Sequence, residues 1–285
     1  MHQLAGLIDD LEAEQIALDD VVSTFGNDEW NRLTPAEGWT SRHQIAHLAF
    51  FDSATEMSLT DPDNTFAEQR RRADQDPDAY SIAVLDPLLE LSPDQLLETW
   101  RQGRRSLLNA FRSAPAGTRH PWYGPSMSLA SMITARLMET WAHGQDIVDA
   151  VGAARPVTSR LEHIARIACL ALPFSFVNRG MLVPDTGVRV SLSLPSGGTW
   201  EFGEERFADS VSGAIEDFCL VMTRRRHMTD TALVTTGPIA GKWVLVGQAY
   251  AGPAGHGRAP GQFARRGVPA SGRGKNTLDA VSVRP

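Results

Sequence analysis

One helix-forming segment is apolar on nearly every side, and this restricts how the rest of the chain can fold. Thr40 is a residue type that caps helices, and from there to about Leu59 apolar side chains occupy almost all faces of a helix. A helix without a polar face is stable only when other elements cover it. We therefore expect residues 40–59 to form a buried helix.

Three more helices are expected in the first half of the chain. The clearest start is Ser92-Pro93-Asp94-Gln95, which offers a capping serine, a proline for the first turn and a glutamine that can bond back to the cap. With residues 61–78 as a polar loop, residues 1–155 are predicted to form an up-down four-helix bundle. The three additional helices are expected at residues 4–22, 93–111 and 128–152.

The second half has a different pattern, which predicts a small α+β domain over residues 156–251. Residues 188–194 alternate between apolar and polar, and Ser196-Gly197-Gly198 can turn the chain into a second strand at 199–202. Further elements are expected at residues 158–172 (helix), 210–226 (helix), 231–236 (strand) and 241–250 (helix or strand).

Composition limits the partners and the location of the protein. The formal net charge of −7 argues against a general nucleic-acid-binding protein. No run of about 18 apolar residues is available to span a membrane, and the acidic N-terminus lacks the plan of a secretory signal. We expect a cytoplasmic protein that binds neither nucleic acid nor membranes, with an oligomeric state that the sequence leaves open. Cys169 and Cys219 match no metal-binding spacing and are expected to be buried free thiols.

The end of the chain differs from both predicted domains. Residues 252–285 are rich in glycine, proline and arginine. Such a segment has too few apolar side chains to build a core. We expect this tail to be disordered.

Three residues are candidates for a metal site. Glu139 and His143 are four positions apart, so on a helix their side chains point the same way. His47 lies on the helix that is predicted to be buried, where an imidazole needs a polar partner. Two imidazoles and one carboxylate can bind a divalent metal and leave a coordination position open, which is typical of a catalytic site.

Simpler interpretations of the same residues remain open. A Glu-x-x-x-His pair on a helix is often a solvated surface pair, and His47 can be a core histidine bonded to a carbonyl. His43 is an alternative ligand one turn from His47, although it lies near the expected helix start. Asp146 is interpreted as a solvated acid, with orientation of an imidazole as the alternative.

The segments Trp39-Thr40 with His47, and Met138-Glu-Thr-Trp-Ala-His-Gly-Gln-Asp146, resemble the mycothiol-dependent maleylpyruvate isomerase family. That family belongs to the DinB-like metal-binding four-helix bundles. The resemblance covers residues 1 to about 152 well and extends more loosely to Asp217-Phe-Cys-Leu-Val-Met-Thr-Arg-Arg-Arg226. It implies that His47, Glu139 and His143 ligate a divalent metal, usually Zn²⁺.

The resemblance also implies a thiol cosubstrate and a substrate-holding arginine. The thiol is mycothiol, the small thiol of actinobacteria, and Arg225 is the best match to the arginine that faces the metal in the family. Within the run from Arg224 to Arg226 the match is uncertain by one position. Arg136 shares a helix face with Glu139, which makes it a candidate contact for the bound thiol.

These residues permit more than one reaction. A metal-activated thiolate can add to an electrophilic carbon, leading either to isomerisation of a small-molecule substrate or to S-transfer. The first alternative is a metal-dependent hydrolase that uses metal-bound water in the same open position. The second is a non-catalytic protein whose second domain holds an apolar ligand.

Overall fold

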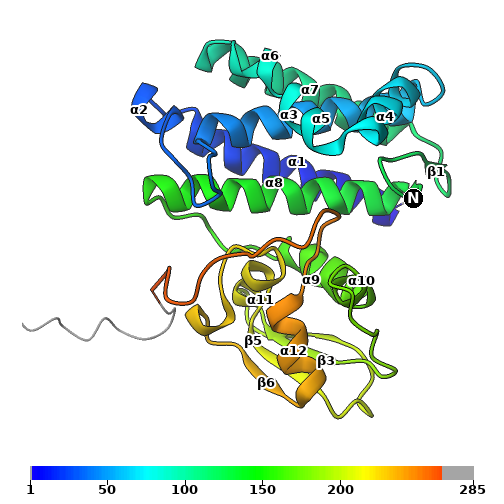
Figure 1. Ribbon diagram of the computed structural model, residues 1–285, viewed down its shortest axis with the longest axis vertical. Helices are drawn as coiled ribbons and strands as arrows, with labels where there is room; N and C mark the ends of the chain where they lie inside the picture. The colour runs from blue at the N-terminus through cyan, green and yellow to red at the C-terminus, as the bar shows by residue number, and fades with distance from the viewer. Residues whose placement is uncertain (1, 265–285) are drawn as a thin grey trace, which may run out of the picture.

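Four long helices form the framework of the larger domain in the computed structural model, which describes residues 2–264 (Figure 1). They pack most extensively in pairs, the first with the last and the second with the third. The helices are α1 (His2–Val22), α3 (Ser41–Thr60), α7 (Pro93–Ser113) and α8 (Leu129–Val151). The predicted fold class, a four-helix bundle followed by a small α+β domain, is confirmed.

Local sequence signals explain where these helices begin and end. Ser92 accepts a hydrogen bond from the backbone N–H of Gln95, whose side chain accepts one from the backbone N–H of Ser92. The Ser128 side chain caps α8 by accepting from the backbone N–H of Ser131, and Gly152 ends the helix with a left-handed φ of 68°. The expected burial of α3 is also confirmed, because Thr60 at its end is its only exposed residue.

The segment predicted as a loop at 61–78 is instead largely helical, so that prediction is wrong. The carboxylates of Asp61 and Asp76 cap two short helices by accepting from the backbone N–H groups of Thr65 and Ala79. Phe66 is the one apolar anchor of the first and is fully buried. With so little apolar periodicity, the helix is invisible to pattern analysis. The short elements around this region are α2 (Asn27–Trp30), α4 (Thr65–Gln75), α5 (Pro77–Ala83), α6 (Asp86–Leu89), β1 (Arg119–His120) and β2 (Met127–Ser128).

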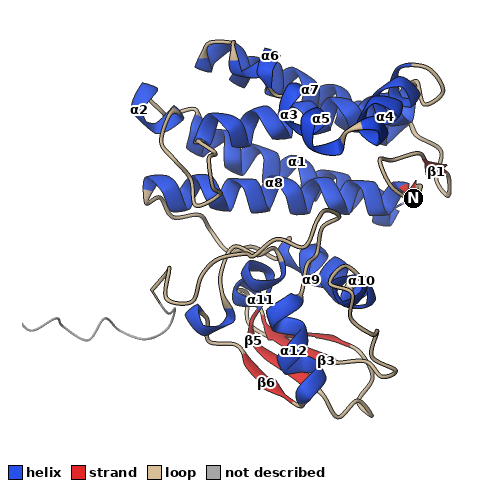
Figure 2. Ribbon diagram, in the orientation of Figure 1, coloured by secondary structure: helices blue, strands red, loops and turns tan. Residues whose placement is uncertain are grey.

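The smaller domain is a four-stranded sheet with helices (Figure 2). The sheet order is β4-β3-β5-β6, in which β3 and β5 are parallel and the outer pairs are antiparallel. The predicted hairpin at 188–202 is confirmed as β3 and β4. The elements are α9 (Leu161–Leu170), α10 (Leu172–Val177), β3 (Arg189–Ser193), β4 (Thr199–Phe202), β5 (Ser210–Ala214), α11 (Ile215–Met222), η1 (Met228–Asp230), β6 (Val234–Thr236) and α12 (Pro238–Val246).

The prediction of a helix over residues 210–226 is wrong for its first part. Residues 210–214 form strand β5, and only from Ile215 does the chain become helical. Val211 is buried and pairs with Val190 of β3 in the sheet. The pairing partner is about twenty positions away in the sequence, so local periodicity favoured the helix that follows.

The two domains share one apolar core, which fixes the smaller domain against the bundle. The core cluster continues from α1, α7 and α8 into α9, α11 and the sheet. The linker between them is held by buried ion pairs, since Arg155 and Arg160 both bond to the carboxylate of Glu14 on α1. As a result, every residue of α8 from Thr140 to Val148 is buried.

The first residues of the predicted tail, 252–264, have specific hydrogen-bond partners. Residues 252–264 lie between the two domains and make hydrogen bonds to both, including one from Arg258 to Asp146 on α8. Residues 265–285 lie outside the described residues. Cys169 and Cys219 are buried free thiols, as predicted. Among the helices of residues 2–264, none combines the length and apolar character needed to cross a membrane.

Candidate metal centre and substrate pocket

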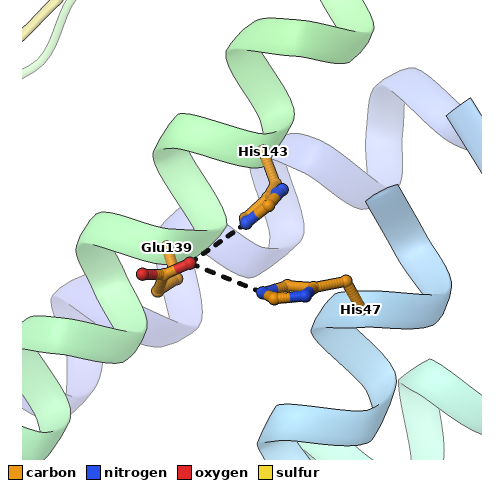
Figure 3. A group of neighbouring side chains, drawn as sticks. All are labelled: His47, Glu139 and His143. Carbon is orange, nitrogen blue, oxygen red and sulfur yellow. Dashed lines mark hydrogen bonds and ion pairs between the residues drawn. The ribbon is translucent and has the colours of Figure 1, made fainter. Parts of the chain in front are cut away.

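Glu139, His143 and His47 meet at one point between α8 and α3 (Figure 3). The Oε2 atom of Glu139 lies 3.0 Å from Nε2 of His143 and 3.6 Å from Nε2 of His47. The three donor atoms are all within 4.8 Å of one another, and they are the one such group within residues 2–264. The side chains are 24%, 11% and 19% exposed, so the cluster is sheltered but reachable. The three residues that the sequence singled out are therefore adjacent in space.

A chain of hydrogen bonds fixes which nitrogen of His143 faces this point. The carbonyl of Trp39 can only accept, so the hydroxyl of Thr34 donates to it. Thr34 Oγ1 in turn accepts from Nε2 of Gln44, which turns the amide oxygen of Gln44 toward His143. That oxygen lies 2.5 Å from Nδ1 of His143, which therefore carries a proton. Nε2 is left as the nitrogen that can bind a metal.

The electrostatics of the cluster favour its metal-binding form. Burial, together with repulsion from His143, lowers the pKa of His47 to about 3, so its imidazole is neutral near pH 7. Burial opposes ionisation of Glu139, but hydrogen bonds to His143 and His47 hold its pKa well below the ordinary value. A carboxylate and a neutral imidazole are the forms in which Glu139 and His47 ligate metals.

The donor set passes a simple test of fit to a cation. The Nε2 atoms of His143 and His47 lie 3.0 and 3.6 Å from the same carboxylate oxygen of Glu139. Nitrogen and oxygen atoms this close need a positive charge between them, either the proton of a hydrogen bond or a metal ion. Two imidazoles and one carboxylate are ligands that zinc accepts.

The cluster opens into a cavity of about 440 Å³ between the domains. The bundle contributes the three potential ligands and Phe51, and the smaller domain contributes Arg225. Its other lining residues include Trp122, Met127, Ala135, Met138, Ile167, Tyr250 and Pro253. The volume suits a small molecule, for which sites of about 300–1,000 Å³ are typical.

The three consecutive arginines of the smaller domain have different contacts. Arg225 lines the cavity, and its Nη2 donates to Oδ2 of Asp146 over 2.9 Å. Arg224 bonds to main-chain carbonyls, including that of Leu245, and Arg226 forms an ion pair with Asp149. Of the three, Arg225 is the one placed at the cavity.

Arg136, the predicted thiol contact, also lines the cavity, but its side chain is mainly engaged in a buried ion pair. Its Nε donates to Oδ1 of Asp52 over 3.0 Å, and both side chains are almost fully buried. Trp100 adds a third side chain by donating to Oδ2 of the same carboxylate. Arg136 therefore has a structural partner that the sequence did not reveal.

Other expectations from the sequence need correction, and two residues must be added to the site. Asp146, interpreted as a solvated acid, is fully buried and pairs with arginines rather than with an imidazole. His43 bonds to Thr40 at the start of α3 and is not part of the cluster. Gln44 and Asp52 were missed. Polar residues inside a helix that is otherwise apolar on all sides were the available signal for both.

A larger cavity of about 660 Å³ lies within the smaller domain, between α9, α10 and the sheet. Its walls include Cys169, Phe207 and Trp243. The group of potential metal ligands lies at the other cavity. We therefore place the functional site between the domains.

The fold and this site define a class of protein: a helical bundle with a His-His-Glu cluster suited to a divalent metal, closed by a small α+β domain. Residues 11–148 match the family model of the mycothiol maleylpyruvate isomerase N-terminal domain. The chain belongs to the mycothiol-dependent maleylpyruvate isomerase family.

Relatives and solved structures extend the similarity beyond the bundle. Uncharacterized proteins from two strains of Mycobacterium tuberculosis, CDC 1551 and H37Rv, are 40% identical over 249 residues, which is 87% of this chain and 96% of theirs. Crystal structures of the mycothiol-dependent maleylpyruvate isomerase and of a mutant of it superpose with TM-scores of 0.54 and 0.56. Each shares 18% identity and covers 78% of this chain and 90% of the solved one, so the two-domain fold is common to them.

Proposed function

We propose that the protein is an enzyme that uses mycothiol to isomerise a small unsaturated acid of the maleylpyruvate type. His47, Glu139 and His143 would hold a divalent metal, with Zn²⁺ as the expected ion. The observation that carries the proposal is the convergence of these three donors on one wall of a cavity that has Arg225 on its other wall. Membership of the family supports the choice of thiol and substrate.

Each residue of the site has a distinct part in this proposal. A bound divalent cation supplies the Lewis acidity that lets a thiol lose its proton near neutral pH. Gln44 keeps Nδ1 of His143 protonated and so presents Nε2 to the metal. Arg225 is positively charged and faces the substrate, where it can pair with a carboxylate.

In this reaction mycothiol is regenerated at the end of each turnover and is not consumed. The thiolate sulfur adds to one carbon of the substrate double bond, which forms a C–S bond and moves the π electrons toward the neighbouring carbonyl. Rotation about the resulting single bond changes the geometry. Return of the electrons restores the double bond and expels the thiolate. Arg225 would stabilise the negative charge that develops on the substrate.

Metal analysis and a thiol-dependence assay test this function. The purified protein should hold about one metal ion per chain and should isomerise maleylpyruvate only when mycothiol is added. The variant His143→Ala should lose both the metal and the activity, whereas His163→Ala, a change at a histidine paired with Asp10 near the surface, should lose neither.

The same experiment separates the other reactions. Mycothiol that is consumed and found joined to the product would identify an S-transferase. Turnover that is independent of thiol would identify a hydrolase. A protein without stoichiometric metal and without turnover would contradict the proposal and favour a binding protein.

A further inference from the structure

The segment after α12 returns to the bundle and passes over the site. Residues 247–264, which we term the C-terminal strap, run from the end of α12 toward α8 and then between the two domains, drawn in orange to red in Figure 1. Its first part, from Ala249 to Pro253, lines the cavity that contains His47, Glu139 and His143. The strap is therefore a wall of the functional site.

Several independent contacts hold the second part of the strap in place. The carboxylate of Asp230 accepts from the backbone N–H groups of Gly261 and Phe263, over 2.7 and 3.2 Å. The guanidinium of Arg226 lies 3.7 Å from the centre of the Phe263 ring. Arg224 donates to the carbonyl of His256 over 2.8 Å. Contacts of this number indicate a defined position for the residues between them.

Arg258 lies between these anchors and reaches the same carboxylate as Arg225. Asp146 is fully buried, and its two oxygens are divided between the two arginines: Oδ2 accepts from Arg225 and Oδ1 from Arg258. Both arginine side chains are 12% exposed. One carboxylate balances at most one of the two positive charges. The pair of arginines and Asp146 together therefore carry a net positive charge beside the cavity.

This sharing has a consequence for Arg225. If Asp146 had Arg225 as its one partner, the planar guanidinium could take both oxygens in a two-pronged ion pair, which is the geometry that arginine and carboxylate prefer. The charge of Arg225 would then be neutralised, and its side chain would be drawn toward Asp146. With Oδ1 occupied by Arg258, Arg225 bonds to one oxygen of Asp146 through Nη2 and to the main-chain carbonyl of Thr223 through Nη1. Each of these nitrogens carries two hydrogens, so donors remain for an anion.

We infer that Arg258 is a positioning residue of the site, which keeps Arg225 oriented and its positive charge only partly balanced, so that it can bind an anionic substrate. The inference rests on the proposed function for the identity of that substrate, but the geometric part stands on the shared carboxylate alone. Arg258 acts through Asp146 and Arg225, and it is not among the residues that line the cavity. Because Arg258 belongs to the C-terminal strap, this role makes the strap a functional segment.

The test compares Arg258→Ala with Arg258→Lys and with a control at Arg206. Lysine restores the positive charge at Oδ1, while Arg206→Ala removes an exposed arginine that pairs with Glu204 away from the site. At saturating mycothiol, Arg258→Ala should raise the KM for maleylpyruvate by about tenfold or more, with a smaller change in kcat. Arg258→Lys should recover most of that loss, and Arg206→Ala should match the wild type.

A second readout does not depend on turnover. Nε of Arg225 is enclosed and has no hydrogen-bond partner among the described residues, so its N–H proton should exchange slowly and give an NMR signal, assigned by its loss in Arg225→Lys. The signal should shift in Arg258→Ala, because Arg225 then takes both oxygens of Asp146. It should stay in place in Arg206→Ala.

The outcomes separate the inference from the proposed function. Unchanged KM and an unmoved Arg225 signal in Arg258→Ala would overturn the inference even if the wild type isomerises maleylpyruvate. Equal losses in the alanine and lysine variants, with a lowered melting temperature, would also overturn it by indicating a structural role. If the wild type shows no thiol-dependent turnover, the proposed function fails, and the Arg225 signal alone decides whether Arg258 positions that residue.

Discussion

The amide oxygen of Gln44 on α3 lies 2.5 Å from Nδ1 of His143 on α8. This contact joins the two helices that carry the potential metal ligands. It also sets the tautomer of the imidazole, because Gln44 is itself oriented by Thr34. A residue that does not line the cavity thus decides whether His143 can act as a ligand through Nε2.

Replacement of Gln44 should weaken metal binding. Removing the partner of a ligating histidine commonly costs about 10–100-fold in metal affinity, and we expect Gln44→Ala to fall in that range. Competition with a chelator measures the dissociation constant. Gln102→Ala, which removes a glutamine paired with Glu98 on the surface of α7, is the control. Equal metal affinities in the two variants would show that the hydrogen bond to Gln44 is dispensable.

The metal-free protein should lose stability in acid through His47. The unfolded side chain binds a proton below about pH 6.5, whereas burial lowers the folded pKa to about 3. Between these values the unfolded state binds more protons, so the free energy of unfolding rises with pH. The slope from this residue is at most about 1.4 kcal/mol per pH unit.

Urea unfolding over this pH range provides the measurement. His47→Gln has no titrating group at this position, so its free energy of unfolding should vary less steeply with pH than that of the wild type. Glu139 acts in the same direction in both proteins, because its pKa is also held low in the folded state. Identical slopes in the two proteins would disprove the assignment to His47.

Arg136 should contribute to stability through Asp52. The variant Arg136→Ala leaves a fully buried carboxylate without its cationic partner, a change that typically costs about 3–5 kcal/mol. The free energy of unfolding measures this loss. A double variant, Arg136→Met with Asp52→Leu, should recover much of it, because no charge is then left buried. A stable Arg136→Ala protein that no longer binds mycothiol would instead support the role in thiol binding.

Arg225 should affect substrate use without affecting the metal. Burial opposes its charge, but Asp146 raises the pKa of its guanidinium above the ordinary value, so Arg225 is a permanent cation. Arg225→Ala should keep the bound metal and reduce kcat/KM for an acidic substrate by at least about tenfold. Steady-state kinetics and metal analysis of the same preparation provide both readings. Unchanged kinetics would remove Arg225 from the site.

Features that depend on neighbouring residues were predictable. The capping serine of α7, the glycine that ends α8 and the turn between β3 and β4 are specified within a few positions, and the structure has all three. The spacing of Glu139 and His143 placed them on one helix face for the same reason. His47 was a candidate because an imidazole among apolar side chains needs a partner.

Features that depend on distant residues were not predictable from pattern alone. Strand β5 forms because β3 is available to pair with it, and α4 is held by one buried phenylalanine under an aromatic cluster. Asp146 resembles a surface acid on its own helix, yet its partners Arg225 and Arg258 lie 79 and 112 positions further along the chain.

The amino-acid sequence by itself determined the helices of the bundle, the kinds of side chain available for a metal site, and the family to which they belong. The tertiary structure alone decided that the two histidines and the glutamate converge, that Gln44 selects a tautomer, and that the C-terminal strap completes the cavity. The physical reason is the distance along the sequence over which each kind of interaction acts. Capping and helical periodicity act over one or two turns, whereas the positions of buried charges follow from how the two domains pack through their shared apolar core.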